Sequence, residues 1–137
     1  MPLESEGEKE TRSWLEKAGE DLRTAEILYK AKPPVLAHVM FHCQQAVEKT
    51  LKAFLTQREI PFRKTHNLRE IGDQCLSVDP SLRELVEASI PLSDYAWEYR
   101  YPGEDEEPTR KEAQQAIAIA KKVYRIIAKK LPSAKRK

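Results

Sequence analysis

The chain has 137 residues, of which 40% are hydrophobic, 34% are charged and only four are glycine. This length fits one domain that buries a real core, and the low glycine content argues against an all-β fold. Its formal net charge is +2, well short of the basic excess of a strong nucleic-acid binder. No stretch reaches the ~18 apolar residues of a membrane span, and no charged-then-apolar leader opens the chain. We therefore expect a cytoplasmic protein with no membrane association.

Apolar residues recur at three- and four-residue steps and predict an all-α fold, a five-helix up-down bundle in one domain over residues 9–131. Residues 1–8 are polar, and we expect them to be disordered. The first helix runs from about Lys9 to Pro33-Pro34, because the residue before a proline is pushed out of the helical region. The same proline pair opens the second helix, which ends near Arg58.

The third and fourth helices begin at capping signals. Asn67, followed by Glu70, predicts a reciprocal capping box for a short third helix. Asp79-Pro80 starts a fourth helix that reaches Tyr99, and Pro91 inside it predicts a kink or a break.

The fifth helix opens at a second capping box, formed by Thr109 and Glu112, and runs to Leu131. Residues 132–137 form a basic flexible tail, whose lysines and arginine we interpret as a solvated chain end.

The second helix carries a polar stripe beside its core face. Two histidines one turn apart lack a third ligand on the helix, so we expect no metal site. Glu48 lies four residues before Lys52, and the two should pair. The stripe is either an ordinary solvated face or a ligand-binding site. Its members, spaced four, three, four and three residues apart, are His38, His42, Gln45, Lys49 and Lys52.

Two further places carry candidate residues. Arginine pairs with phosphate and tyrosine stacks on a base, so Tyr99, Arg100 and Tyr101 are candidate ligand-binding residues. Alternatively, these tyrosines pack at a helix end and the arginine neutralises nearby acids. His66 precedes a helix N-terminus and is suited to acid/base work, or else it only supports the cap.

Other recognisable chemistry is absent from the sequence. Cys43 and Cys75 fall among apolar neighbours, which indicates two reduced core thiols. There is no glycine-rich phosphate loop, nucleophile elbow or metal-ligand cluster of known spacing, so we expect no cofactor.

Three segments in this order, FHCQQAVEKTLKAF at 41–54, THNL at 65–68 and RYP at 100–102, resemble a prokaryotic HEPN domain. The resemblance covers nearly the whole chain. It implies a five-helix fold that commonly forms a homodimer, and a minimal nucleotidyltransferase as partner. Some such pairs act as toxin and antitoxin, with the HEPN member cutting RNA.

The sequence departs from the nuclease members of that family. They carry an Arg-x4-6-His motif, whereas four, five and six intervening residues after Arg100 lead to Asp105, Glu106 and Glu107. An acidic loop beside the arginine also repels an RNA phosphate. We therefore expect no catalytic activity of the chain alone.

Three hypotheses follow from the sequence. The first is a homodimeric nucleotide-binding or partner module of a minimal nucleotidyltransferase, within a toxin-antitoxin pair. The second is an RNA-cleaving toxin in which Arg100 binds phosphate and His66 or His42 supplies acid/base chemistry. The third is a structural or interaction bundle without a ligand.

Overall fold

The computed structural model describes residues 4–95 and 107–131, and all its regular structure is helical. Within these ranges it contains five α-helices and two short 3-10 helices, which confirms the predicted all-α, five-helix fold. The predicted ligand-binding residues Tyr99, Arg100 and Tyr101 and the basic tail 132–137 lie outside the described residues. In the part of the chain that is described, no helix is long and apolar enough to span a bilayer.

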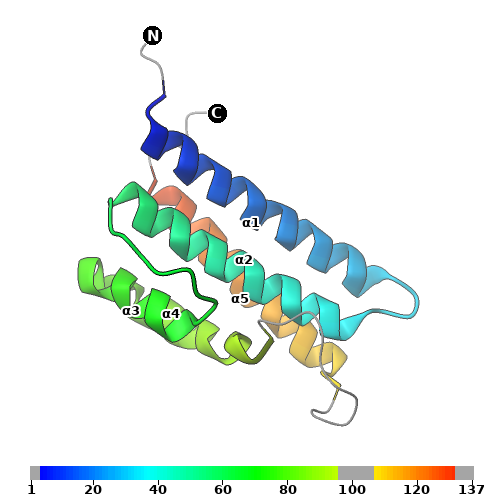
Figure 1. Cartoon of the computed structure of the whole chain (residues 1–137). Helices are drawn as coiled ribbons and strands as arrows, with labels where there is room; N and C mark the ends of the chain where they lie inside the picture. Colours follow the sequence, from blue (N-terminus) through cyan, green and yellow to red (C-terminus); the bar gives the residue numbers. More distant parts are fainter. Residues whose placement is uncertain (1–3, 96–106, 132–137) are drawn as a thin grey trace.

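Helix α2 (Leu36–Gln57) forms the centre of the bundle. In the view of Figure 1, α1 (Glu6–Lys30) lies above it and α5 (Arg110–Lys129) behind it, while α3 (Leu68–Val78) and α4 (Arg83–Ser89) lie below. Because α2 is covered from several sides, most of its residues are buried, polar ones included. The largest fully buried side chains include Phe54, Leu51, Leu55, Leu68, Ile71 and Ile127.

Helix α1 begins at Glu6, earlier than predicted, so residues 6–8 are helical and not disordered. The reason is a capping box that the sequence reading overlooked. The Ser5 hydroxyl accepts from the Glu8 amide at 3.1 Å, and the Glu8 carboxylate accepts from the Ser5 amide at 2.9 Å. The two bonds satisfy helix N-terminal donors that would otherwise be unpaired.

The two predicted capping boxes are confirmed, the one at α5 in full and the one at α3 in one of its two bonds, and the Asp79 side chain caps η1 (Pro80–Leu82) by accepting from the Ser81 amide. At α5, Thr109 and Glu112 form both bonds of the predicted box. At α3, the Asn67 side chain accepts from the Glu70 amide at 3.2 Å, but the Glu70 carboxylate binds Arg63 at 2.6 and 2.8 Å. A bidentate, charge-assisted pair with arginine is stronger than a single bond to a neutral amide, so Glu70 turns away from the cap.

The predicted fourth helix is divided into three segments. A 3-10 turn, η1 (Pro80–Leu82), precedes α4, and a second, η2 (Ile90–Tyr95), follows it. Helix α4 therefore ends just before Pro91, where the break was predicted, because proline has no amide hydrogen and its ring clashes with the preceding turn.

The connector between α2 and α3 starts at a sharp turn. Glu59 adopts a left-handed conformation with φ of 60°. The Glu59 amide donates to Thr56 at 3.0 Å, and the Ile60 amide donates to Leu55 at 2.9 Å. This pattern is a Schellman motif, which ends α2 and sends residues 60–67 back along the helix.

Candidate functional site

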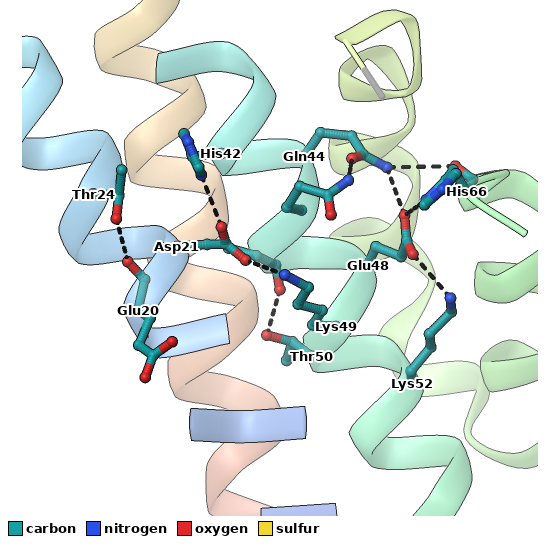
Figure 2. Close-up of polar contacts among 12 residues, drawn as sticks. Glu20, Asp21, Thr24, His42, Gln44, Glu48, Lys49, Thr50, Lys52 and His66 are labelled. Carbon is teal, nitrogen blue, oxygen red and sulfur yellow. Dashed lines mark hydrogen bonds and ion pairs between the residues drawn. The ribbon is translucent and has the colours of Figure 1, made fainter. Parts of the chain in front are cut away.

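The predicted polar stripe of α2 is divided between two clusters instead of forming one solvated face. His42 and Lys49 reach toward α1, whereas Lys52 lies at the connector and Gln45 bonds to its neighbour Gln44 (Figure 2). Gln45 and Lys52 are buried, with 9% and 6% of their surface exposed. These two residues therefore do not belong to a solvated face of the helix.

The first cluster is built on Asp21, a mostly buried residue of α1. His42 Nδ1 lies 2.8 Å from Asp21 Oδ1, and Lys49 Nζ lies 2.7 Å from Asp21 Oδ2. A carboxylate only accepts, so the Nδ1 of His42 carries the proton. The His42 and Lys49 side chains remain 22% and 23% exposed, so this cluster is accessible from outside.

The second cluster is built on Glu48, whose side chain is only 3% exposed. Glu48 Oε2 accepts from Lys52 Nζ at 2.8 Å, which confirms the predicted pair. Glu48 Oε1 lies 3.1 Å from Gln44 Nε2 and 2.9 Å from His66 Nδ1. The connector folds over α2 to bring His66 to this carboxylate, and no helix periodicity indicates that contact.

Glu48 fixes the orientation of the His66 ring. Because Nδ1 must donate to the carboxylate, the neutral ring has its lone pair on Nε2. The His66 side chain is 48% exposed, while its carboxylate partner is buried. A buried carboxylate behind a partly exposed histidine is an arrangement suited to acid/base work or to hydrogen bonding with a ligand.

Asp21 is the site residue that the sequence analysis overlooked. It lies among Ala18, Leu22 and Ala25, on the face of α1 that packs into the core. An acidic residue within an apolar stripe is costly to bury unless it is paired, and this signal was readable from the sequence. The sequence did not indicate that its partners would be His42 and Lys49 of α2.

A groove opens where the connector meets the ends of α1 and α2. Its volume is about 770 Å³, and Lys52 is the one predicted stripe residue that lines it. The Lys52 ammonium lies 5.4 Å from the ring centre of Trp14 and 5.6 Å from that of Phe62.

The His38 side chain, the remaining member of the predicted stripe, is half-buried one turn before His42. Among the described residues, no three histidine, cysteine or acidic side chains are grouped to hold a metal ion.

Comparisons with known proteins agree with this architecture. The family model described as HEPN domain matches residues 11–131. Among solved structures, TT1696 from Thermus thermophilus is 31% identical with a TM-score of 0.73, over 88% of this chain and 98% of that one. ST0689, an archaeal HEPN homologue, has the same fold at 20% identity, with a TM-score of 0.70 over 88% of this chain and 97% of that one.

A search of curated proteins finds no match. The family match spans all five helices, including both carboxylate clusters and the connector that carries His66. The resemblance drawn from the three sequence segments is thereby confirmed, and the chain belongs to the HEPN domain family.

Proposed function

We propose that this chain is a binding module that pairs with a minimal nucleotidyltransferase, as a homodimer and within a toxin-antitoxin pair. The observation that carries the proposal is the Asp21 cluster, in which one buried carboxylate holds His42 at 2.8 Å and Lys49 at 2.7 Å. These side chains are fixed before any partner arrives, so a partner or nucleotide loses little side-chain entropy on binding.

The missing Arg-x4-6-His motif favours binding over catalysis by this chain. The sequence after Arg100 offers Asp105, Glu106 and Glu107 at the motif positions. Binding needs only the exposed parts of His38, His42 and Lys49, together with the candidate ligand-binding residues Tyr99, Arg100 and Tyr101 of the sequence.

The test is co-expression with a minimal nucleotidyltransferase, taken from a neighbouring gene if one is encoded there, followed by co-purification and titration. We expect a complex at micromolar concentration that Lys49→Met weakens, because it removes a partly exposed ammonium from the pre-formed surface. Lys111→Met, on an exposed position of α5, is the matched control and should leave binding unchanged. No complex at micromolar concentration, or equal weakening by both variants, would contradict the proposal.

A second candidate is RNA cleavage, which the contact between Glu48 and His66 favours. In this pairing a buried carboxylate orients a partly exposed histidine, the type of group that general acid/base catalysis uses. In this function Arg100 binds the scissile phosphate.

RNA digestion by the wild type, Arg100→Ala and His66→Ala separates the two candidates. A nuclease loses about 10²-fold or more of its rate when a general acid or base is removed. The same background in all three proteins, without growth arrest on expression, would rule out RNA cleavage.

A further inference from the structure

The groove between Trp14 and Phe62 has the dimensions of a ligand site, and the proposed function does not use it. Its volume is about 770 Å³, within the range of about 300–1,000 Å³ that is typical of small-molecule pockets. Three separate segments build it: the first turns of α1, the last turns of α2 and the start of the connector.

The walls of the groove are aromatic. Trp14 comes from α1 and Phe62 from the connector, and their ring centres lie 6.3 Å apart at an interplanar angle of 60°. Both side chains are half-buried, so the surrounding packing holds the rings while part of each faces the groove. Ile60 and Pro61 extend this apolar surface. Because the two walls are tilted, a flat ring can stack on one of them and meet the other with its edge, and both are favourable aromatic contacts.

The floor of the groove supplies hydrogen-bond donors. Lys52 is only 6% exposed, yet it lines the groove. Its ammonium has three donors, and within the described part of the chain it makes one hydrogen bond, to Glu48 at 2.8 Å. Two N–H groups of the Lys52 ammonium therefore remain for an acceptor that enters the groove.

The rim of the groove is electrically balanced. Glu10, Glu59 and Lys64 line it, and Lys17 lies in the adjoining depression on the other side of Trp14. Two carboxylates and two ammonium groups cancel, and the Lys52–Glu48 pair below them is neutral as well. The rim therefore gives no net attraction to a polyphosphate.

We propose that the groove binds an uncharged planar heteroaromatic ring that carries a carbonyl group. The ring stacks on Trp14 and packs its edge against Phe62, and the carbonyl accepts from the Lys52 ammonium. This site goes beyond the proposed function, because it needs neither a partner protein nor phosphate groups on the ligand.

Trp14 reports on its own site. The chain has two tryptophans, so Trp97→Phe leaves Trp14 as the only indole in the otherwise full-length protein. Inosine and adenosine are the two probes, since both are planar purine nucleosides and inosine has a ring carbonyl where adenosine has an amino group. We expect inosine to quench Trp14 fluorescence saturably, with half-saturation below about 1 mM. Adenosine should bind about 5-fold more weakly or worse, because it cannot accept from Lys52 at that position.

Two further probes distinguish binding of the ring from binding of phosphate groups. Inorganic tripolyphosphate should cause no saturable change, and inosine triphosphate should bind no tighter than inosine. Saturable binding of tripolyphosphate, equal affinity for inosine and adenosine, or no saturable quenching by either nucleoside would each overturn the proposal. Because no nucleotidyltransferase is present, these outcomes are independent of the partner-binding test.

Matched variants locate the site. Phe62→Leu keeps the wall apolar and removes its ring, and should weaken inosine binding about 5-fold or more. Phe41→Leu removes a half-buried ring of α2 that packs on His42 and should have no effect. Lys52→Met should abolish the preference for inosine over adenosine. If that variant does not fold, Phe62→Leu still decides, because equal binding by both leucine variants refutes the assignment.

Discussion

At the scale of single residues, two buried carboxylates determine what the polar side chains of α2 do. Asp21 and Glu48 each accept from a histidine Nδ1 through one oxygen and from a lysine ammonium through the other. Burial makes each carboxylate costly unless it is paired, and the pairing in turn fixes side chains that would otherwise rotate freely in water.

Replacement of Glu48 tests this directly. In Glu48→Gln the Lys52 ammonium stays buried without a compensating charge, so we expect a loss of about 3–5 kcal/mol in the free energy of unfolding. Glu84→Gln, at an exposed position of α4, should change it by less than about 0.5 kcal/mol. Urea denaturation of both variants and the wild type measures the difference, and similar midpoints for all three would show that the pair contributes nothing.

The two thiols should be inert in the folded protein. Burial raises the pKa of Cys43 to about 12, with a smaller contribution from Asp21, and burial raises that of Cys75 to about 12 as well. Because the thiolate is the reactive form, iodoacetamide at about pH 8 should label neither cysteine in the native state and both after unfolding. Mass spectrometry of the two samples provides the check, and rapid native labelling of either thiol would contradict its burial.

At the scale of elements, local signals set where helices start and close packing sets how they meet. The boxes at Ser5–Glu8 and Thr109–Glu112 fix two helix starts. The close contact between α3 and α4 depends instead on a glycine, Gly72, which has no side chain. A Cβ at Gly72 would lie 2.5 Å from Val86 Cγ1, too close for any residue but glycine without a shift of the packing.

Gly72→Ala and Gly19→Ala form a matched pair of substitutions within helices. The first forces α3 away from Val86 and should cost about 1–3 kcal/mol in unfolding free energy. The second meets only an ordinary contact, at 3.5 Å from the Tyr124 hydroxyl, so the helix preference of alanine should stabilise α1 by about 0.5–1 kcal/mol. Opposite shifts of the thermal midpoint are expected, and a neutral Gly72→Ala would show that the interface has room.

At the scale of the whole molecule, charged pairs connect segments that are distant in the sequence. Lys130, at the end of α5, lies 3.1 Å from Asp79, which caps η1. Hydrogen bonds from Ser81 and then the Lys130 contact hold the pKa of Asp79 below its usual value of 3.8. The folded state favours the ionised Asp79 carboxylate. The pair therefore stabilises the fold at pH values above the pKa that Asp79 has in the unfolded chain. This stabilisation is lost as the pH falls through the lower pKa that Asp79 has in the folded protein.

Asp79→Asn should therefore destabilise the protein at about pH 7 and less so at about pH 2. The site is close to the surface, so the effect should be modest and should shrink in high salt. Denaturation curves of the wild type and the variant at both pH values measure it. A difference that stays constant with pH would show that the Asp79 charge has no part in stability.

The sequence by itself determined the helical class, all five helices, the side-chain caps of α3 and α5 and the break at Pro91. It also identified the Glu48–Lys52 pair and the family. These features depend on residues that are close in the chain, where periodicity, capping and proline geometry act within a few positions.

Only the tertiary structure decided how the candidate site is assembled. Asp21 meets His42 and Lys49 because α1 packs on α2, and His66 meets Glu48 because the connector folds back over the helix. The groove walls, Trp14 and Phe62, come from segments far apart in the sequence. Such contacts arise from the packing of whole elements, and neither periodicity nor spacing along one helix encodes them.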